Sequence, residues 1–364
     1  MLANLLKKII VFIPGIILAL ILYLLSEGIN NVIGKELMGY EKSPISTVMI
    51  SIIIGILMGN AFTPRPGFRI GLEFTQTYIL KLGIICLGIR LSFDEFIKFG
   101  TIAIPLIIIC ILSVLVLVKT LIKKFKISSK MSYLIAIGTS VCGATAIVAT
   151  APVINAKKGE VAYAIANITL FGVFSMLVYP YFANFYFDGN SLYAGLFLGT
   201  AIHETSQVAA AGMIYDQQFN SPEALNIATV TKLIRNTFLI IMIPLFGYLY
   251  NRGNTEGKKV LILDIFPYFV LGFIGMIVLR NIGDEIIQVQ GYNEETWNVF
   301  ISYTKDIAKI CLTMAMAAVG MSTNLSELKE MGYKPFIVGL IAAITVGLVS
   351  ILAMQSVEKI TSLL

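Results

Sequence analysis

Long apolar runs fill nearly the whole chain, and this feature limits its fold more than any other. About eleven such segments occur, at 9–26, 45–62, 75–92, 101–118, 131–155, 161–184, 191–214, 224–250, 262–280, 299–321 and 334–355. Only 13% of the 364 residues are charged, against about 25% in a soluble domain. Runs of this length and polarity are typical of membrane-spanning helices. The sequence therefore predicts an all-α polytopic membrane protein.

The loops and their charges support this class. All loops are short, so we expect one integral membrane domain over residues 1–364. The net charge is +6, but the lysines lie mostly in loops, which the positive-inside rule explains better than nucleic-acid binding does. Residues 1–8 are basic, and the apolar run after them lacks a small-residue cleavage site. That run is expected to be the first span, with a cytoplasmic N-terminus.

The chain lacks the motifs of several other protein classes. All four cysteines lie inside apolar segments without a CxxC spacing, which argues against a disulfide framework and a redox or metal site. A single histidine, His203, offers no second imidazole ligand, so neither a metal nor another cofactor is expected. No GxxxxGKS/T motif is present, which excludes direct drive by ATP within this chain.

Two pairs of similar stretches indicate an internal duplication. LGIRLSFDEFIKFG (87–100) aligns without gaps with VGMSTNLSELKEMG (319–332), and two glycines and a glutamate coincide. IGTSVCGATAIVATAPVI (137–154) aligns with LGTAIHETSQVAAAGMI (198–214), and both continue from a Gly-Thr pair through small residues. We therefore expect repeat-related halves at 45–184 and 191–355.

The direction of these repeats bears on the topology. If every segment spans the bilayer, the first pair is inverted but the second is parallel. The conflict disappears if segments 131–155 and 191–214 are re-entrant, because each then enters and leaves on one side. The lysines on both flanks of 131–155 then lie in the cytoplasm, and the lysine-free loop 182–191 lies outside. Nine spans, two re-entrant elements and an outside C-terminus are favoured; eleven spans with two broken helices remain the alternative.

The middles of these two segments are rich in small and polar residues. Glycine lowers the cost of leaving helical geometry, and hydroxyls can satisfy the freed backbone groups. Paired interrupted helices point to a transporter's substrate site, although small residues also serve close helix packing. The substrate-binding candidates are Thr139, Ser140, Cys142, Gly143 and Thr145 in the first segment and His203, Thr205, Ser206 and Gln207 in the second.

Ionisable residues within apolar segments form a further group of candidates, because burying them in a membrane is costly. Glu204 and His203 are expected to bind a coupling proton or cation. Asn167 is the polar group at comparable depth in the repeat-related span and joins this set. The alternative for Glu204 and His203 is a hydrogen-bonded pair that holds the turn together.

Two cations lie in the apolar segment 224–250. Lys232 and Arg235 are three residues apart, which places them on one helical face near half depth. A buried pair of positive charges needs a partner, and an anionic substrate is the favoured one. A salt bridge to Glu204, Asp94 or Glu95 is the structural alternative.

A second charged pair ends the stretch LGIRLSFDEF (87–96). Arg90 and Asp94 have an i, i+4 spacing, which predicts a local ion pair on one helical face near the outer interface. A gate or vestibule role is the functional alternative.

Several of these motifs together carry a family resemblance. LGIRLSFDEF, GTSVCGATAIVATAPVI, IHETSQVAAAG and TVTKLIRN, in this order, resemble the YeiH-like family of bacterial membrane proteins, labelled as sulfate exporters, over nearly the whole chain. That family is similar to the bile acid:sodium symporters and cation/proton antiporters. The resemblance implies a bacterial plasma-membrane protein with an inverted repeat, whose core domain moves against a panel domain. It also implies that residues 142–145 and 203–207 line a crossing of two interrupted helices.

These observations favour secondary active transport of a small anion, namely a sulfur oxyanion, a sulfonate or a carboxylate, coupled to a proton or sodium. The chain is not expected to be an enzyme. An anion channel would need a continuous polar lining, whereas these polar groups cluster. An intramembrane enzyme using Cys142 and His203 is a third alternative. The expected partners are the anion, the coupling ion and the lipid bilayer; the oligomeric state, a homodimer included, is left open.

Overall fold

The computed structural model describes residues 11–37, 46–62, 65–125, 128–251, 268–290, 294–323 and 333–361. Within these ranges the regular elements are all helical. By length and composition alone, seven stretches of the described residues are long and apolar enough to cross a membrane: Ile13–Asn31, Pro66–Arg90, Phe93–Val118, Ser129–Thr150, Gly159–Tyr186, Pro222–Phe246 and Phe336–Gln355. One of them, Ser129–Thr150, is interrupted and folds back on itself, as described below. The structure therefore confirms an all-α polytopic membrane protein.

The remaining predicted segments differ from ordinary spans. Thr47–Ala61 and Ser191–Ala201 are apolar helices, but they are short. The helices that cover much of 262–280 and 299–321 are long, yet each carries charged residues along its length and neither is among the seven. The count of eleven is thus not confirmed. Residues 9–10, 262–267 and the repeat stretch 324–332 lie outside the described ranges.

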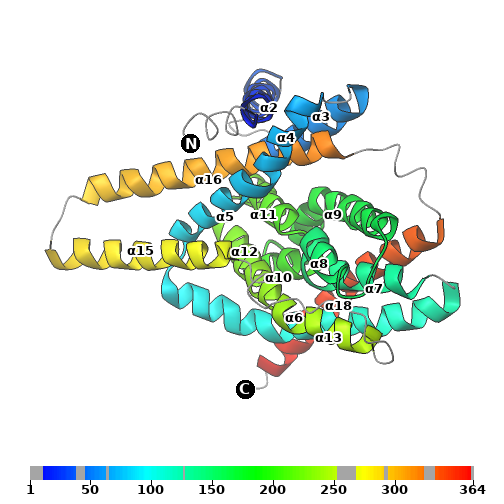
Figure 1. Cartoon of the computed structure of the whole chain (residues 1–364). Helices are drawn as coiled ribbons and strands as arrows, with labels where there is room; N and C mark the ends of the chain where they lie inside the picture. Colours follow the sequence, from blue (N-terminus) through cyan, green and yellow to red (C-terminus); the bar gives the residue numbers. More distant parts are fainter. Residues whose placement is uncertain are drawn as a thin grey trace, which may run out of the picture. The chain divides into compact units, whose positions relative to one another are not determined.

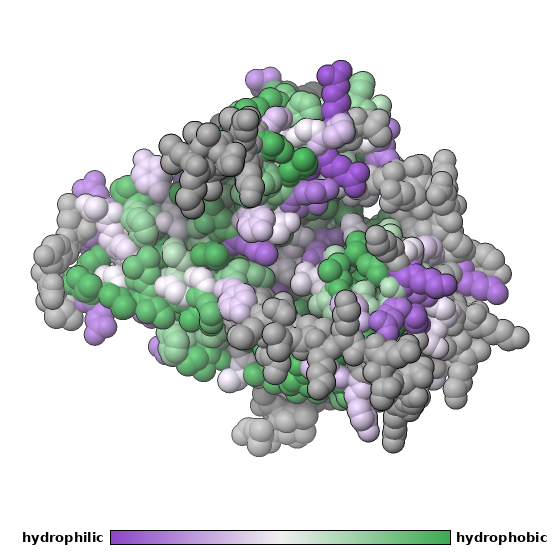
Figure 2. Space-filling view, viewed as in Figure 1, coloured by the Kyte–Doolittle hydropathy of each residue, from purple (hydrophilic) through white to green (hydrophobic). Residues whose placement is uncertain are grey.

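The contacts divide the chain into two compact units. The first comprises Met1–Phe96, Met213–Pro222 and Tyr268–Leu325, and the second comprises Ile97–Gly212, Glu223–Pro267 and Ser326–Leu364. Many exposed side chains are apolar, and Figure 2 shows apolar (green) surface over much of the visible face. In a soluble protein such surface would mark association sites, whereas a membrane helix presents it to lipid.

The first unit is built around one long helix. Its elements are α2 (Ile13–Asn31), η1 (Val32–Leu37), α3 (Thr47–Ala61), α4 (Pro66–Phe74), η2 (Thr75–Ile79), α5 (Leu80–Leu87), η3 (Gly88–Arg90), α15 (Phe269–Gln290) and α16 (Glu294–Ser322). Helix α16 packs along α3 and α5, and α15 packs along α5 (Figure 1). Gly55 and Gly320 let α3 and α16 approach closely, since a Cβ on either would meet the other helix's backbone.

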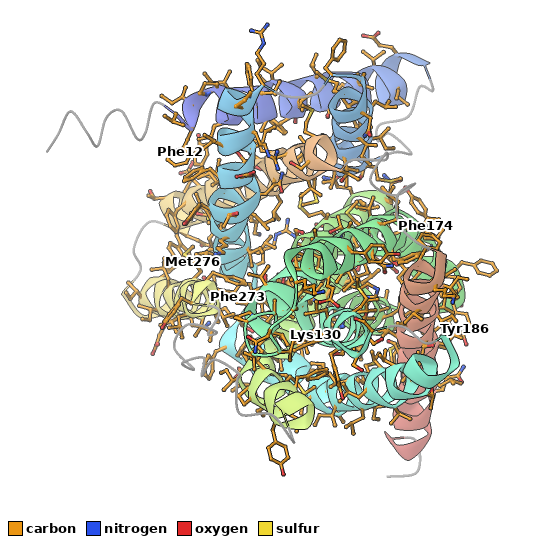
Figure 3. All side chains as sticks on the ribbon, turned by 45° about the vertical axis from the view of Figure 1, so that its right-hand side comes forward. Phe12, Lys130, Phe174, Tyr186, Phe273 and Met276 are labelled. Atoms are coloured by element: carbon orange, nitrogen blue, oxygen red, sulfur yellow. The ribbon has the colours of Figure 1, made fainter. Side chains whose placement is uncertain are left out.

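The contact between α2 and α4 yields a first prediction. A Cβ at Gly71 would overlap backbone atoms of Phe12 and Gly15, whereas a Cβ at Gly28 of α2 meets nothing within 4 Å. Phe12, labelled in Figure 3, also packs against Phe74 of α4, with the rings tilted by 35° and their centroids 4.8 Å apart. We expect Gly71→Ala to destabilise the protein by about 1–3 kcal/mol through overpacking. A thermal melt in detergent checks this; an equal loss in Gly28→Ala would contradict it.

The second unit contains both interrupted segments. Its elements are most of α6 (Phe93–Phe125), then α7 (Ser129–Ile137), η4 (Gly138–Cys142), α8 (Gly143–Thr150), α9 (Lys158–Tyr186), α10 (Ser191–Ala201), the first half of α11 (Thr205–Phe219), α12 (Pro222–Thr237), α13 (Leu239–Asn251) and α18 (Tyr333–Thr361). Leu134, Ile147 and Ile168 belong to a buried cluster that joins α7, α8 and α9.

The segment predicted at 131–155 folds back on itself. The Lys130 ammonium, labelled in Figure 3, donates to the Asn155 carbonyl at 2.6 Å, so the start of α7 meets the chain just after α8. The hydroxyl of Ser128 likewise donates to Glu160 at the start of α9, at 2.7 Å. Both ends of the segment therefore lie together. This is the geometry of a helical hairpin, as the re-entrant topology predicts.

The segment predicted at 191–214 also turns back. Helices α10 and α12 lie side by side and run parallel, because Gly195 faces Ala224 and Ile227 while Gly199, one turn on, faces the next turn of α12. Helix α11 must therefore carry the chain from the far end of α10 back to the beginning of α12. Below, the hairpin tips are residues 139–143 and 200–204.

Candidate functional site

Both hairpin tips contain backbone that has left helical geometry. Gly143 has φ +41°, a conformation that residues with a side chain rarely adopt, and it separates η4 from α8. In the second tip, Ile202 is extended (φ −90°, ψ 140°) and α11 begins only at Thr205. The last carbonyls of a helix have no intrahelical partner. At membrane depth those of η4 and α10 need partners from elsewhere in the protein.

Lys232 of α12 satisfies carbonyls from both tips. Its side chain is fully buried, and its ammonium donates to Val141 O at 2.9 Å, to Ile202 O at 3.2 Å and to His203 O. An ammonium has three donors. All three are therefore used by backbone oxygens.

Arg235 performs the same task one helical turn later. Its guanidinium, also fully buried, donates from Nε to Ser140 O at 2.8 Å and from Nη2 to Thr139 O in the first tip. Its Nη1 reaches Thr200 O at 2.6 Å and Ile202 O at 3.2 Å in the second. The planar fork of arginine can join two separate segments in this way, which a single ammonium does less well.

These contacts change the expected role of the two cations. The i, i+3 spacing does place Lys232 and Arg235 on one face, but their donors are directed at backbone carbonyls. The salt-bridge alternative is therefore not what the structure shows. The C-terminal end of a helix carries a partial negative charge, so a buried cation there is electrostatically favourable. The pair binds the two tips to each other and to α12.

Glu204 contacts the first tip at the N-terminal end of α8, where the helix carries a partial positive charge. Its Oε2 accepts a hydrogen bond from the backbone amide of Ala144 at 2.8 Å, in the first turn of α8. A Cβ at Gly143 would overlap this carboxylate, so glycine is required for the approach. Glu204 and Ala144 are only partly buried, and Thr145 is exposed. A carboxylate from the second hairpin thus occupies the positive end of a helix in the first.

A chain of polar contacts links the two tips to α12. The thiol of Cys142 lies 3.4 Å from the Thr205 hydroxyl, which accepts a hydrogen bond from the Asn236 amide at 3.0 Å. The sequence reading missed Asn236. Its position on α12, four residues after Lys232 and next to Arg235, could have indicated its role. A residue at i+4 lies on the same side of a helix as residue i.

Other predicted residues are buried near these contacts. His203 is 1% exposed, and neither ring nitrogen has a hydrogen-bond partner within the described part of the chain. Gln207 donates to the Thr169 carbonyl of α9 at 3.2 Å, while its Oε1 has no such partner there. Ser206 is 4% exposed. A buried imidazole without a partner is costly, which makes His203 a candidate for direct ligand contact.

Two further predicted residues have partners outside the tips. Asn167 of α9 packs against Gly339 of α18, where a Cβ would overlap its amide. Arg90 does not pair with Asp94 but with Asp216 of α11, at 3.0 Å. The expected local pair was wrong because the helix ends at Arg90 and Leu91 is extended. The i, i+4 rule applies only within a continuous helix.

Comparisons with known proteins agree with a membrane protein. A UPF0324 membrane protein of Streptococcus agalactiae is 35% identical, and the alignment covers 95% of this chain and 97% of the relative. One from Fusobacterium nucleatum is 35% identical over 85% of this chain and 89% of its own length, and one from Photorhabdus laumondii is 31% identical over 90% and 89%. No solved structure matches. The family model "Conserved hypothetical protein 698" matches residues 14–339, and the chain belongs to this family of multi-pass membrane proteins.

Proposed function

We propose that this protein is a secondary transporter of a small anion, either a sulfur oxyanion, a sulfonate or a carboxylate, coupled to a proton or sodium. One observation carries the proposal. Two helical hairpins meet at their tips within one unit, where their non-helical backbone is held by buried cations and one carboxylate. Interrupted helices of this kind form substrate and ion sites in secondary transporters. The proposal includes the plasma membrane, with the N-terminus in the cytoplasm.

The proposed anion site is the accessible end of α8. The Ala144 amide and the hydroxyl of Thr145, an exposed residue whose side chain also reaches the Cys142 thiol, offer donors at the positive end of the helix. The Glu204 carboxylate already accepts from this amide. A substrate carboxylate or oxyanion therefore competes with Glu204 for the same donor.

This competition provides a route to coupling. A charged Glu204 holds the amide and repels an incoming anion. A proton or sodium ion bound to the Glu204 carboxylate removes that charge, frees the amide and lets the substrate bind. Substrate and coupling ion then favour each other's binding, which is the requirement for symport. Lys232 and Arg235 contribute a positive potential without leaving their carbonyl partners.

The test measures anion uptake into proteoliposomes that contain the purified protein. The anions are sulfate, thiosulfate, sulfite, sulfonates and small carboxylates, each at pH 6 and pH 8, with and without sodium. We expect uptake of one anion class to depend on proton or sodium. Glu204→Gln should abolish that dependence and lower the coupled rate at least about tenfold. Glu223→Gln, an exposed carboxylate in the first turn of α12, is the matched control. No uptake of any anion, or full coupling in Glu204→Gln, would refute the proposal.

A further inference from the structure

A second group of charges lies in the first unit, where η3 packs against α15 and α16. Arg90 ends η3, Arg280 lies in the middle of α15 and Lys305 lies in the middle of α16. Lys305 is partly buried, and its helix packs against η3, which ends at Arg90. Both arginines and the Asp216 carboxylate lie within electrostatic range of its ammonium. Three cations from three elements therefore converge on one place.

Two of these cations have carboxylate partners. Arg90 pairs with Asp216 at 3.0 Å, and Arg280 pairs with Asp284 at 2.6 Å. Lys305 has no carboxylate within 4.0 Å among the residues that the structure describes. The next lysine of α16 differs, because Lys309 lies 3.9 Å from Glu27. Among these three cations and the two carboxylates that pair with them, one positive charge thus remains.

Arg90 adds unused hydrogen-bonding capacity. Its side chain is 19% exposed, and its Nε is buried without a hydrogen-bond partner in the described residues. A guanidinium has five donors, and among the described residues that of Arg90 makes one hydrogen bond, to Asp216. Partly buried cations with unused donors are costly unless an anion completes the group.

We propose that Arg90, Arg280 and Lys305 bind an anion, at a site built from residues of the first unit. The ligand is an oxyanion with several acceptor oxygens. It is either a free sulfate or phosphate ion or the phosphate group of an anionic lipid. Arginine forks suit such groups, and lysine adds a point charge. The inference does not depend on the transport mechanism above, since all three cations belong to the other unit.

The chain contains its own reporter for this site. Trp297 is the single tryptophan, and its indole donates to Asp284 Oδ1 at 2.8 Å. The other oxygen of Asp284 accepts from Arg280 at 2.6 Å. An anion that attracts Arg280 changes the hydrogen bond of the indole. Tryptophan emission therefore reports on the first unit.

The experiment titrates the full chain in neutral detergent with sodium sulfate and sodium phosphate, against sodium chloride at equal ionic strength, following tryptophan emission. A parallel arm compares nanodiscs of phosphatidylcholine with nanodiscs that also contain phosphatidylglycerol. We expect saturable emission changes with the free oxyanions, with phosphatidylglycerol, or with both. Lys305→Met should raise the apparent Kd about tenfold, the change expected for loss of one charged contact. Lys309→Met is the matched control and should titrate like the unaltered chain.

The outcomes separate the alternatives. A response to free oxyanions alone assigns the site to a soluble anion, and a response to phosphatidylglycerol alone assigns it to a lipid headgroup. An unchanged titration in Lys305→Met overturns the proposal. A second result also overturns it: no anion changes the tryptophan emission, and each anion stabilises the Lys305→Met chain and the unaltered chain equally in a thermal melt. Failure of Glu204→Gln to affect transport would leave this result untouched.

Discussion

Arg235→Ala is expected to lower the free energy of unfolding by about 4 kcal/mol, because several buried backbone carbonyls lose a charged hydrogen-bond donor at once. The guanidinium satisfies carbonyls in both hairpin tips. Without it the carbonyl oxygens of Thr139, Ser140 and Thr200 lose this donor, each at a cost of about 1–3 kcal/mol before relaxation, whereas Ile202 O keeps its bond from Lys232. The apparent melting temperature of the purified protein in detergent measures the loss.

Two variants test whether this cost comes from bridging the tips. Arg235→Lys keeps the charge but loses the planar fork, so it should recover only part of the stability. Arg69→Ala removes an arginine that is 76% exposed and paired with Glu73 one turn away. That change should cost at most about 0.5 kcal/mol. Unaltered melting of Arg235→Ala together with lost anion binding would show that Arg235 serves the ligand rather than the fold.

Gly143→Ala is expected to abolish anion-dependent transport while lowering stability by about 2 kcal/mol. Part of this cost comes from φ +41°, which disfavours a Cβ. The larger functional effect comes from contact, because the new methyl group would displace the Glu204 carboxylate from the Ala144 amide. Proteoliposome uptake and a thermal melt on the same preparation measure the two effects separately.

Alanine substitutions at two further glycines distinguish the cost of backbone strain from the effect of displacing Glu204. Gly189 has φ +73°, and its Cβ would meet only Asn184, at 3.8 Å. Gly189→Ala should therefore show the backbone cost with transport retained. Gly159, near the start of α9, has neither a positive φ nor a neighbour within 4 Å. Gly159→Ala should be neutral or slightly stabilising, because alanine favours a helix. Normal transport by Gly143→Ala would show that Glu204 can act without its present position.

At the tips, the two cations and Glu204 differ in how many hydrogen-bond partners hold them in place. All three donors of Lys232 and four of the five donors of Arg235 are bound to backbone oxygens, so moving these side chains during a transport cycle would expose carbonyls from both hairpins. Glu204 accepts a hydrogen bond from the Ala144 amide and is partly accessible. It can change partner at lower cost. We therefore expect the cations to stay fixed while Glu204 exchanges ligands.

Much of the fold followed from local sequence properties. Apolar runs predicted membrane helices because a bilayer requires each segment to satisfy its own backbone. The small and polar runs around Gly143 and Glu204 predicted the two interruptions. Lysines on both flanks of 131–155 predicted the first hairpin, which the contact between Lys130 and Asn155 now supports. These features depend on neighbours in the chain, so the sequence alone determined them.

The partners of the charged residues depended on tertiary structure. The spacing of Lys232 and Arg235 placed them on one face, but only the packing of α12 against both tips directed them to carbonyls. Arg90 was assigned to Asp94 by spacing, yet the helix end after Arg90 and the position of α11 gave it Asp216. A buried charge takes whichever group the fold brings within about 3 Å. Such groups lie far apart in the sequence, where helical periodicity carries no information about them.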